Sequence, residues 1–114
     1  MSAEKFIKVC FQVSLNAIND RSKEHSIYDK KFGKFTVRPL PDGRLDVNYS
    51  ASDRGFAGYE EIDKAKTDAE NAWDWVRCLI NMICDRHGEA VRLREKMHKQ
   101  LLEAPDDFCL EMTE

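Results

Sequence analysis

Hydrophobic residues between positions 62 and 84 recur at steps of three and four, which is the period of an α-helix. A second apolar row, formed by Trp75, Leu79 and Met82, lies on another side of the same helix. A helix that covers one surface needs only one apolar face. This helix is therefore predicted either to be enclosed within its own domain or to offer one face to a partner. The main row consists of Ile62, Ala65, Ala69, Ala72, Trp73, Val76, Ile80 and Ile83.

The long helix is expected to cover about residues 60–87. Glu60, Glu61 and Asp63 would form its first turn, where acidic side chains complement the positive end of the helix dipole. Gly88 is expected to end the helix, because glycine is favoured just beyond a helix C-terminus. A single continuous rod with Gly88 in its interior is the alternative.

The N-terminal segment fits two patterns. Alternating apolar and polar residues over positions 6–15 suit a β-strand, whereas a helix accounts for residues 3–20 and has a suitable N-cap in Ser2. We favour the helix because it explains the longer stretch. Its apolar row is Phe6, Cys10, Val13 and Ala17.

Residues 34–49 read as a β-hairpin. Asp42-Gly43 lies between two alternating runs, which is a strong signal for a tight turn between antiparallel strands. Ile27 and Tyr28 are expected to form a further short strand, and residues 50–59 are expected to form a glycine-containing loop.

A C-terminal helix is predicted over residues 89–103, with Ala104 and Pro105 stopping it. Its thin apolar stripe consists of Ala90, Leu93, Met97 and Leu101. The predicted fold class is thus α+β, with a small antiparallel sheet (hairpin 34–49) packed on the long helix and with flanking N- and C-terminal helices. Residues 1–104 would form a single globular domain and residues 105–114 an acidic C-terminal tail.

Composition fits one soluble domain. The chain has 114 residues, a net charge of −3 and 42% hydrophobic residues. Its four cysteines form no C-x-x-C pair, and no apolar run approaches the roughly 18 residues of a membrane span. Because the first residues also lack the apolar region of a signal peptide, we expect a cytoplasmic protein with reduced thiols.

No motif for catalysis or for binding a metal or cofactor stands out, so no catalytic, metal or cofactor residue is predicted. Cys84 and His87 have the spacing of one helix face, but a zinc site needs about four converging ligands. We prefer to explain this pair as a small cysteine in the core and a favourable cation at a helix C-terminus.

Basic residues are concentrated between Arg21 and Arg38, a segment that contains six basic and two acidic residues. This segment could bind nucleic acid, although the negative net charge argues against a general nucleic-acid binder. The order of helix, strands and long helix resembles a double-stranded-RNA-binding domain. Such domains carry a basic cluster at the start of the last helix, whereas residues 60–66 hold more acids than lysines. No RNA-binding residue is therefore inferred.

Another protein is the expected partner, and a homodimer is possible. Aromatic residues and arginine are enriched in protein interfaces, which selects Arg54, Phe56, Tyr59, Trp75 and Met82 as candidate partner-binding residues. Small acidic proteins without motifs are typical of inhibitors and of accessory proteins encoded by phages or mobile elements. We expect a small non-catalytic protein of this kind, with a nucleic-acid-binding module or an unrecognised enzyme as alternatives.

Overall fold

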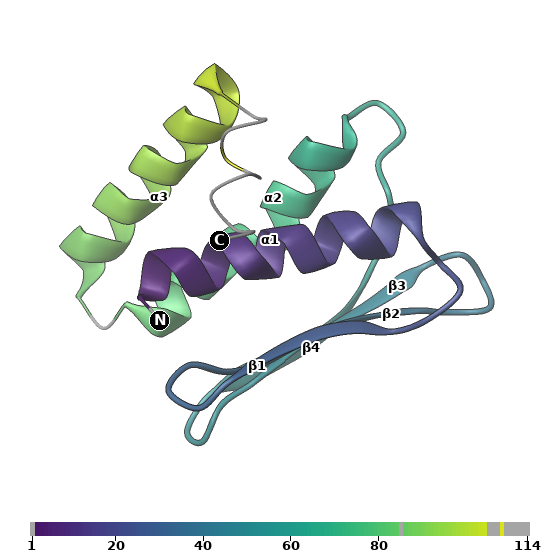
Figure 1. The fold of residues 1–114 in the computed structure, drawn as a ribbon, viewed down its shortest axis with the longest axis horizontal. Helices are drawn as coiled ribbons and strands as arrows, with labels where there is room; N and C mark the ends of the chain where they lie inside the picture. Colours follow the sequence, from purple (N-terminus) through teal and green to yellow (C-terminus); the bar gives the residue numbers. More distant parts are fainter. Residues whose placement is uncertain (1, 85, 105–107, 109–114) are drawn as a thin grey trace.

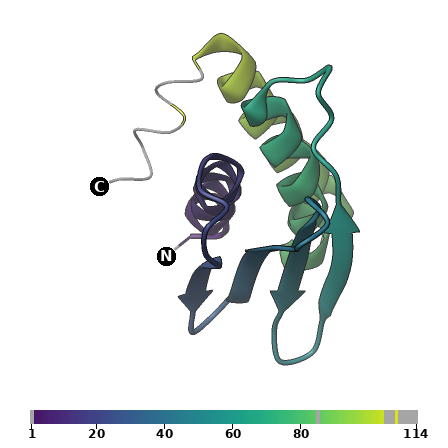
Figure 2. The ribbon, with the colours of Figure 1, turned by 90° about the vertical axis from the view of Figure 1, so that its right-hand side faces the viewer.

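The computed structural model describes residues 2–84, 86–104 and 108. A four-stranded antiparallel sheet, in the order β1-β2-β3-β4, lies beneath three helices (Figures 1 and 2), which confirms the α+β class. The elements are α1 (Ala3–Asn19), β1 (His25–Asp29), β2 (Gly33–Pro39), β3 (Leu45–Ser50), β4 (Gly55–Glu60), α2 (Asp68–Ile83) and α3 (His87–Glu103).

Helix α1 confirms the helical reading of the N-terminal segment. The Ser2 hydroxyl accepts a hydrogen bond from the Lys5 N–H at 3.1 Å, which caps the first turn. The helix packs on β1 and β2, and its apolar side is buried there. The helical period thus prevails over the alternating pattern, because it collects the large side chains Phe6, Ile7 and Phe11 in the core.

The hairpin of β2 and β3 is also confirmed. The Leu40 N–H donates to the Arg44 carbonyl at 2.9 Å, and Gly43 takes the positive φ of 90° that the turn requires. Alternate side chains of the two strands are buried under the helices, namely Phe35, Val37, Leu45, Val47 and Tyr49.

The expected loop over residues 50–59 is wrong, because most of it forms the edge strand β4. The strand pairs with β3 without interruption from Gly55, opposite Ser50, to Glu60, opposite Leu45. Phe56 turns towards the core and its ring lies 6.2 Å from the ring of Tyr49. The glycines of this segment suggest a loop, but its pairing with β3 stabilises it as a strand.

The expected start of the long helix is also wrong, since α2 begins at Asp68 and Glu60 ends β4. Thr67 and Glu70 form a capping box: the Thr67 hydroxyl accepts from the Glu70 N–H at 3.1 Å, and the Glu70 carboxylate accepts from the Thr67 N–H. Buried Asn71 ties down the preceding connection through hydrogen bonds with the backbone of Asp63 and Thr67.

The chain leaves the helical path at Cys84, the extended C-cap of α2, and α3 starts at His87. Gly88 therefore neither ends the long helix nor lies inside one continuous rod, because it belongs to the first turn of α3.

Helix α2 is enclosed within the chain, as the first of the two interpretations of its apolar rows predicts. Helix α1 packs against it on one side and α3 on another (Figure 2). The Trp73 ring stacks on the His98 ring of α3, with centroids 5.3 Å apart and planes 3° apart. Phe108, the described residue of the predicted tail, is buried and packs edge-on against Phe11 at 4.9 Å. The rest of residues 105–114 lies outside the described residues.

Candidate functional site: the open face and free edge of the sheet

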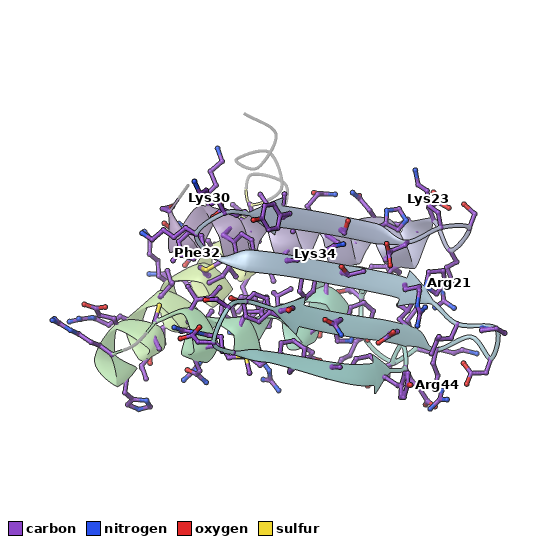
Figure 3. All side chains as sticks on the ribbon, turned by 90° about the horizontal axis from the view of Figure 1, so that it is seen from below. Arg21, Lys23, Lys30, Phe32, Lys34 and Arg44 are labelled. Atoms are coloured by element: carbon purple, nitrogen blue, oxygen red, sulfur yellow. The ribbon has the colours of Figure 1, made fainter. Side chains whose placement is uncertain are left out.

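The sheet has one face that the described helices leave uncovered (Figures 2 and 3). Side chains that alternate with the buried ones point to this open face. Because neighbouring strands pair in register, these side chains form rows across the sheet. The first row is Tyr28, Lys34, Ser50 and Gly55, the second is Ser26, Thr36, Asn48 and Ala57, and the third is Arg38, Asp46 and Tyr59.

The two charged side chains of the third row pair with each other. Arg38 and Asp46 form a salt bridge at 2.9 Å across β2 and β3. The Arg44 guanidinium lies 5.0 Å from the centre of the Tyr59 ring and also binds Asp42. Hydrogen bonds from Arg44 hold the pKa of Asp42 below its usual value, so this ion pair persists in mildly acidic solution. Tyr59 stays 64% exposed beside this pair.

The free edge of β4 presents backbone groups to solvent. In an antiparallel pair, residues alternate between those bonded to the neighbouring strand and those that point away from it. The Ala51 N–H donates to the Arg54 carbonyl at 2.8 Å, which fixes the phase of this alternation. Gly55, Ala57 and Tyr59 accordingly direct their N–H and C=O groups outwards, and all three residues are exposed.

This edge lacks the features that usually protect an edge strand. Proteins commonly block such edges with lysine, proline or a β-bulge. The sequence of β4, Gly-Phe-Ala-Gly-Tyr-Glu, contains neither lysine nor proline, and its register with β3 shows no bulge. No further strand pairs with β4 in the part of the chain that the structure describes. The edge is therefore available for pairing with another polypeptide.

The five predicted partner-binding residues do not form one surface in the structure. Trp75 is 4% exposed and Phe56 is packed on the core, so the protein's own interior accounts for both side chains. Arg54 and Met82 lie together, because the Arg54 guanidinium donates to the Met82 carbonyl and also pairs with Asp53 at 3.0 Å. This contact fastens the β3–β4 turn to the end of α2. Only Tyr59 of the five is exposed.

Backbone groups of the free edge were not among the sequence candidates. Their direction depends on which residues of β4 bond to β3, and that is known only once the register is known. The signal that was present is the low side-chain bulk of Gly55 and Ala57 beside the aromatic Tyr59.

Burial raises the pKa of the Cys10 and Cys78 thiols, so both favour the protonated, weakly nucleophilic form. Cys84 and His87 do not share a helix face, because Cys84 caps the end of α2 and His87 begins α3. Within residues 2–84, 86–104 and 108, no three His, Cys, Asp or Glu side chains are grouped so that they could hold a metal ion. None of the described helices is long and apolar enough to span a membrane.

Comparison with known proteins gives no relative to this chain: no family model matches it, and neither a curated protein nor a solved structure shows significant similarity.

Proposed function

We propose that this protein is a small, non-catalytic cytoplasmic protein that binds another protein by adding an extended segment of that partner to the free edge of β4. The observation that supports this proposal is the unprotected edge of β4. Gly55, Ala57 and Tyr59 each direct one donor and one acceptor outwards, which is the arrangement used in strand addition. An inhibitor or an accessory protein would act in this way by occupying a segment of its target.

Side chains around the edge suit an incoming strand. Ala57 and Gly55 on the open face carry little bulk, so they leave space for the side chains of a partner strand. The exposed Tyr59 ring at the end of β4 offers apolar area and a hydroxyl, which are properties of residues that anchor interfaces. Main-chain hydrogen bonds would supply affinity, and contacts with Tyr59 would supply specificity.

A second copy of the chain is a special case of this partner. Antiparallel pairing of two β4 strands would join two sheets through a symmetric interface. Gel filtration over a range of concentrations separates self-pairing from binding to a different protein, because only self-pairing changes the elution volume of the purified protein.

Ala57→Pro is expected to abolish partner capture and to leave the fold intact. Proline removes the outward-pointing N–H of residue 57, which β3 does not use, and such a position on an edge strand tolerates proline. Ala57→Val is the matched control, because it adds bulk but keeps the N–H and favours the strand conformation.

The measurement compares proteins captured from an extract of the native host by the immobilised wild type and by both variants. Circular dichroism of each variant checks the fold. Equal capture by Ala57→Pro and the wild type would remove the edge of β4 from the binding surface.

A further inference from the structure

Two turns meet at one end of the sheet and form a cleft of about 320 Å³ between them. The β1–β2 turn approaches the end of β3 so closely that a Cβ atom on Gly33 would lie 2.4 Å from the Ser50 carbonyl oxygen. The Tyr49 hydroxyl donates to the Phe32 carbonyl and fastens the same turn to β3. The cleft is thus held by a close backbone approach and by a hydrogen bond from a buried tyrosine.

Positive charge dominates this cleft. Lys30, Lys31 and Lys34 line it, and none of the lining residues is acidic. We call these three residues the lysine cradle. Figure 3 shows Lys30 near one end of the sheet, Lys34 along β2, and the basic residues Arg21, Lys23 and Arg44 at the opposite end.

No carboxylate among the described residues forms an ion pair with the cradle. The structure shows no ion pair for Lys30, Lys31 or Lys34, whereas Arg38, Arg44 and Lys66 all have acidic partners. Asp29, which is next to the cradle in sequence, accepts hydrogen bonds from the Lys31 and Phe32 N–H groups at 2.8 and 3.0 Å and so shapes the turn. Three unneutralised ammonium groups around one cleft create a positive potential that favours an anion.

Hydroxyl groups and an aromatic ring complete the cleft. Ser50 and Ser52 line it beside the lysines, and hydroxyls are common partners of phosphate oxygens. Tyr28 lies directly across the strand pair from Lys34 and is 68% exposed, so a face of its ring is available for stacking. Phosphate donors and a stacking ring side by side are the combination that binds nucleotides.

We propose that the lysine cradle binds the phosphate group of a nucleotide, either free or within a single strand of nucleic acid, while the base stacks on Tyr28. This site is separate from the free edge of β4 and does not depend on strand addition there. Binding draws on three lysines of the basic segment 21–38, and it is compatible with the net charge of −3 because no acidic residue lines the cleft.

Amide chemical shifts of the full-length protein, recorded during titration with adenosine monophosphate, test the proposal. We expect shifts at residues 28–34 and 50–52 and tighter binding than for inorganic phosphate or adenosine alone. Lys34→Gln should weaken binding by about tenfold, because it removes a charge-assisted hydrogen bond. Tyr28→Ser should reduce the affinity for the nucleotide to that for phosphate. Lys99→Gln, which alters an exposed lysine of α3, is the matched control and should bind as the wild type does.

A titration with an oligothymidylate distinguishes the two sources of the nucleotide. Tighter binding than that of the mononucleotide, with a strong dependence on salt, identifies a single strand, and equal or weaker binding identifies a free nucleotide. The proposal is overturned if neither ligand shifts the cradle residues, or if Lys34→Gln binds adenosine monophosphate as tightly as the wild type does.

Discussion

Trp75→Ala is expected to lower the free energy of unfolding by about 3–5 kcal/mol, the usual cost of removing a buried tryptophan. Trp75 is 4% exposed on α2, which is enclosed between α1 and α3. Truncation therefore leaves a cavity that neighbouring helices fill only in part. Small domains have about 5–15 kcal/mol of total stability, so the variant should unfold at much lower urea concentration.

Tyr59→Ala is the matched comparison for this measurement. Its ring is 64% exposed and its recorded ring contact is with Arg44, so its loss should cost no more than about 1 kcal/mol. Trp75 would instead belong to an interface between chains if Trp75→Ala kept the urea midpoint and shifted the protein towards a smaller species on gel filtration.

Gly33→Ala is expected to destabilise the protein far more than Gly43→Ala. Both glycines have positive φ, 109° and 90°, which costs a residue with a side chain about 1–2 kcal/mol. At Gly33 the added methyl group would also lie 2.4 Å from the Ser50 carbonyl oxygen, whereas at Gly43 it meets nothing within 4 Å. The β1–β2 turn must therefore move away from β3 in the first variant only.

Thermal unfolding of both variants measures this difference. We expect Gly43→Ala to lose only the stability that a positive φ costs a residue with a side chain. Gly33→Ala should lose at least about 1 kcal/mol more stability, because overpacking typically adds about 1–3 kcal/mol. Equal melting temperatures for the two variants would show that the β1–β2 turn is not in tight contact with β3. The lysine cradle would then lose its rigid support.

Local signals in the sequence were sufficient for α1, for the β2–β3 hairpin and for α3. Each of these signals acts over a few residues, so the element can be predicted without knowledge of the tertiary structure. The signals are the N-cap Ser2, the turn Asp42-Gly43 and the helical stripe of Ala90, Met97 and Leu101. The start of α2 had such a signal as well. Thr67 and Glu70 have the spacing of a capping box, whereas the acidic residues from Glu60 suggested an earlier start.

Strand β4 had no comparable local signal. Gly55, Ala57 and Gly58 have low strand propensity, and the segment becomes a strand because β3 provides a partner and Phe56 packs on the core. The free edge and the lysine cradle depend in the same way on register. The sequence shows a basic segment, but only pairing of β1, β2 and β3 places Tyr28, Lys34 and Ser50 in one row.

Hydrogen exchange of individual amides tests strand addition most directly, with the captured partner present in saturating amount and with the free protein as reference. The amides of Gly55, Ala57 and Tyr59 point outwards, so a partner strand should slow their exchange by at least about tenfold, while Phe56 and Gly58, already bonded to β3, change much less. Unchanged exchange at Gly55, Ala57 and Tyr59 in the saturated complex would contradict binding through the edge of β4.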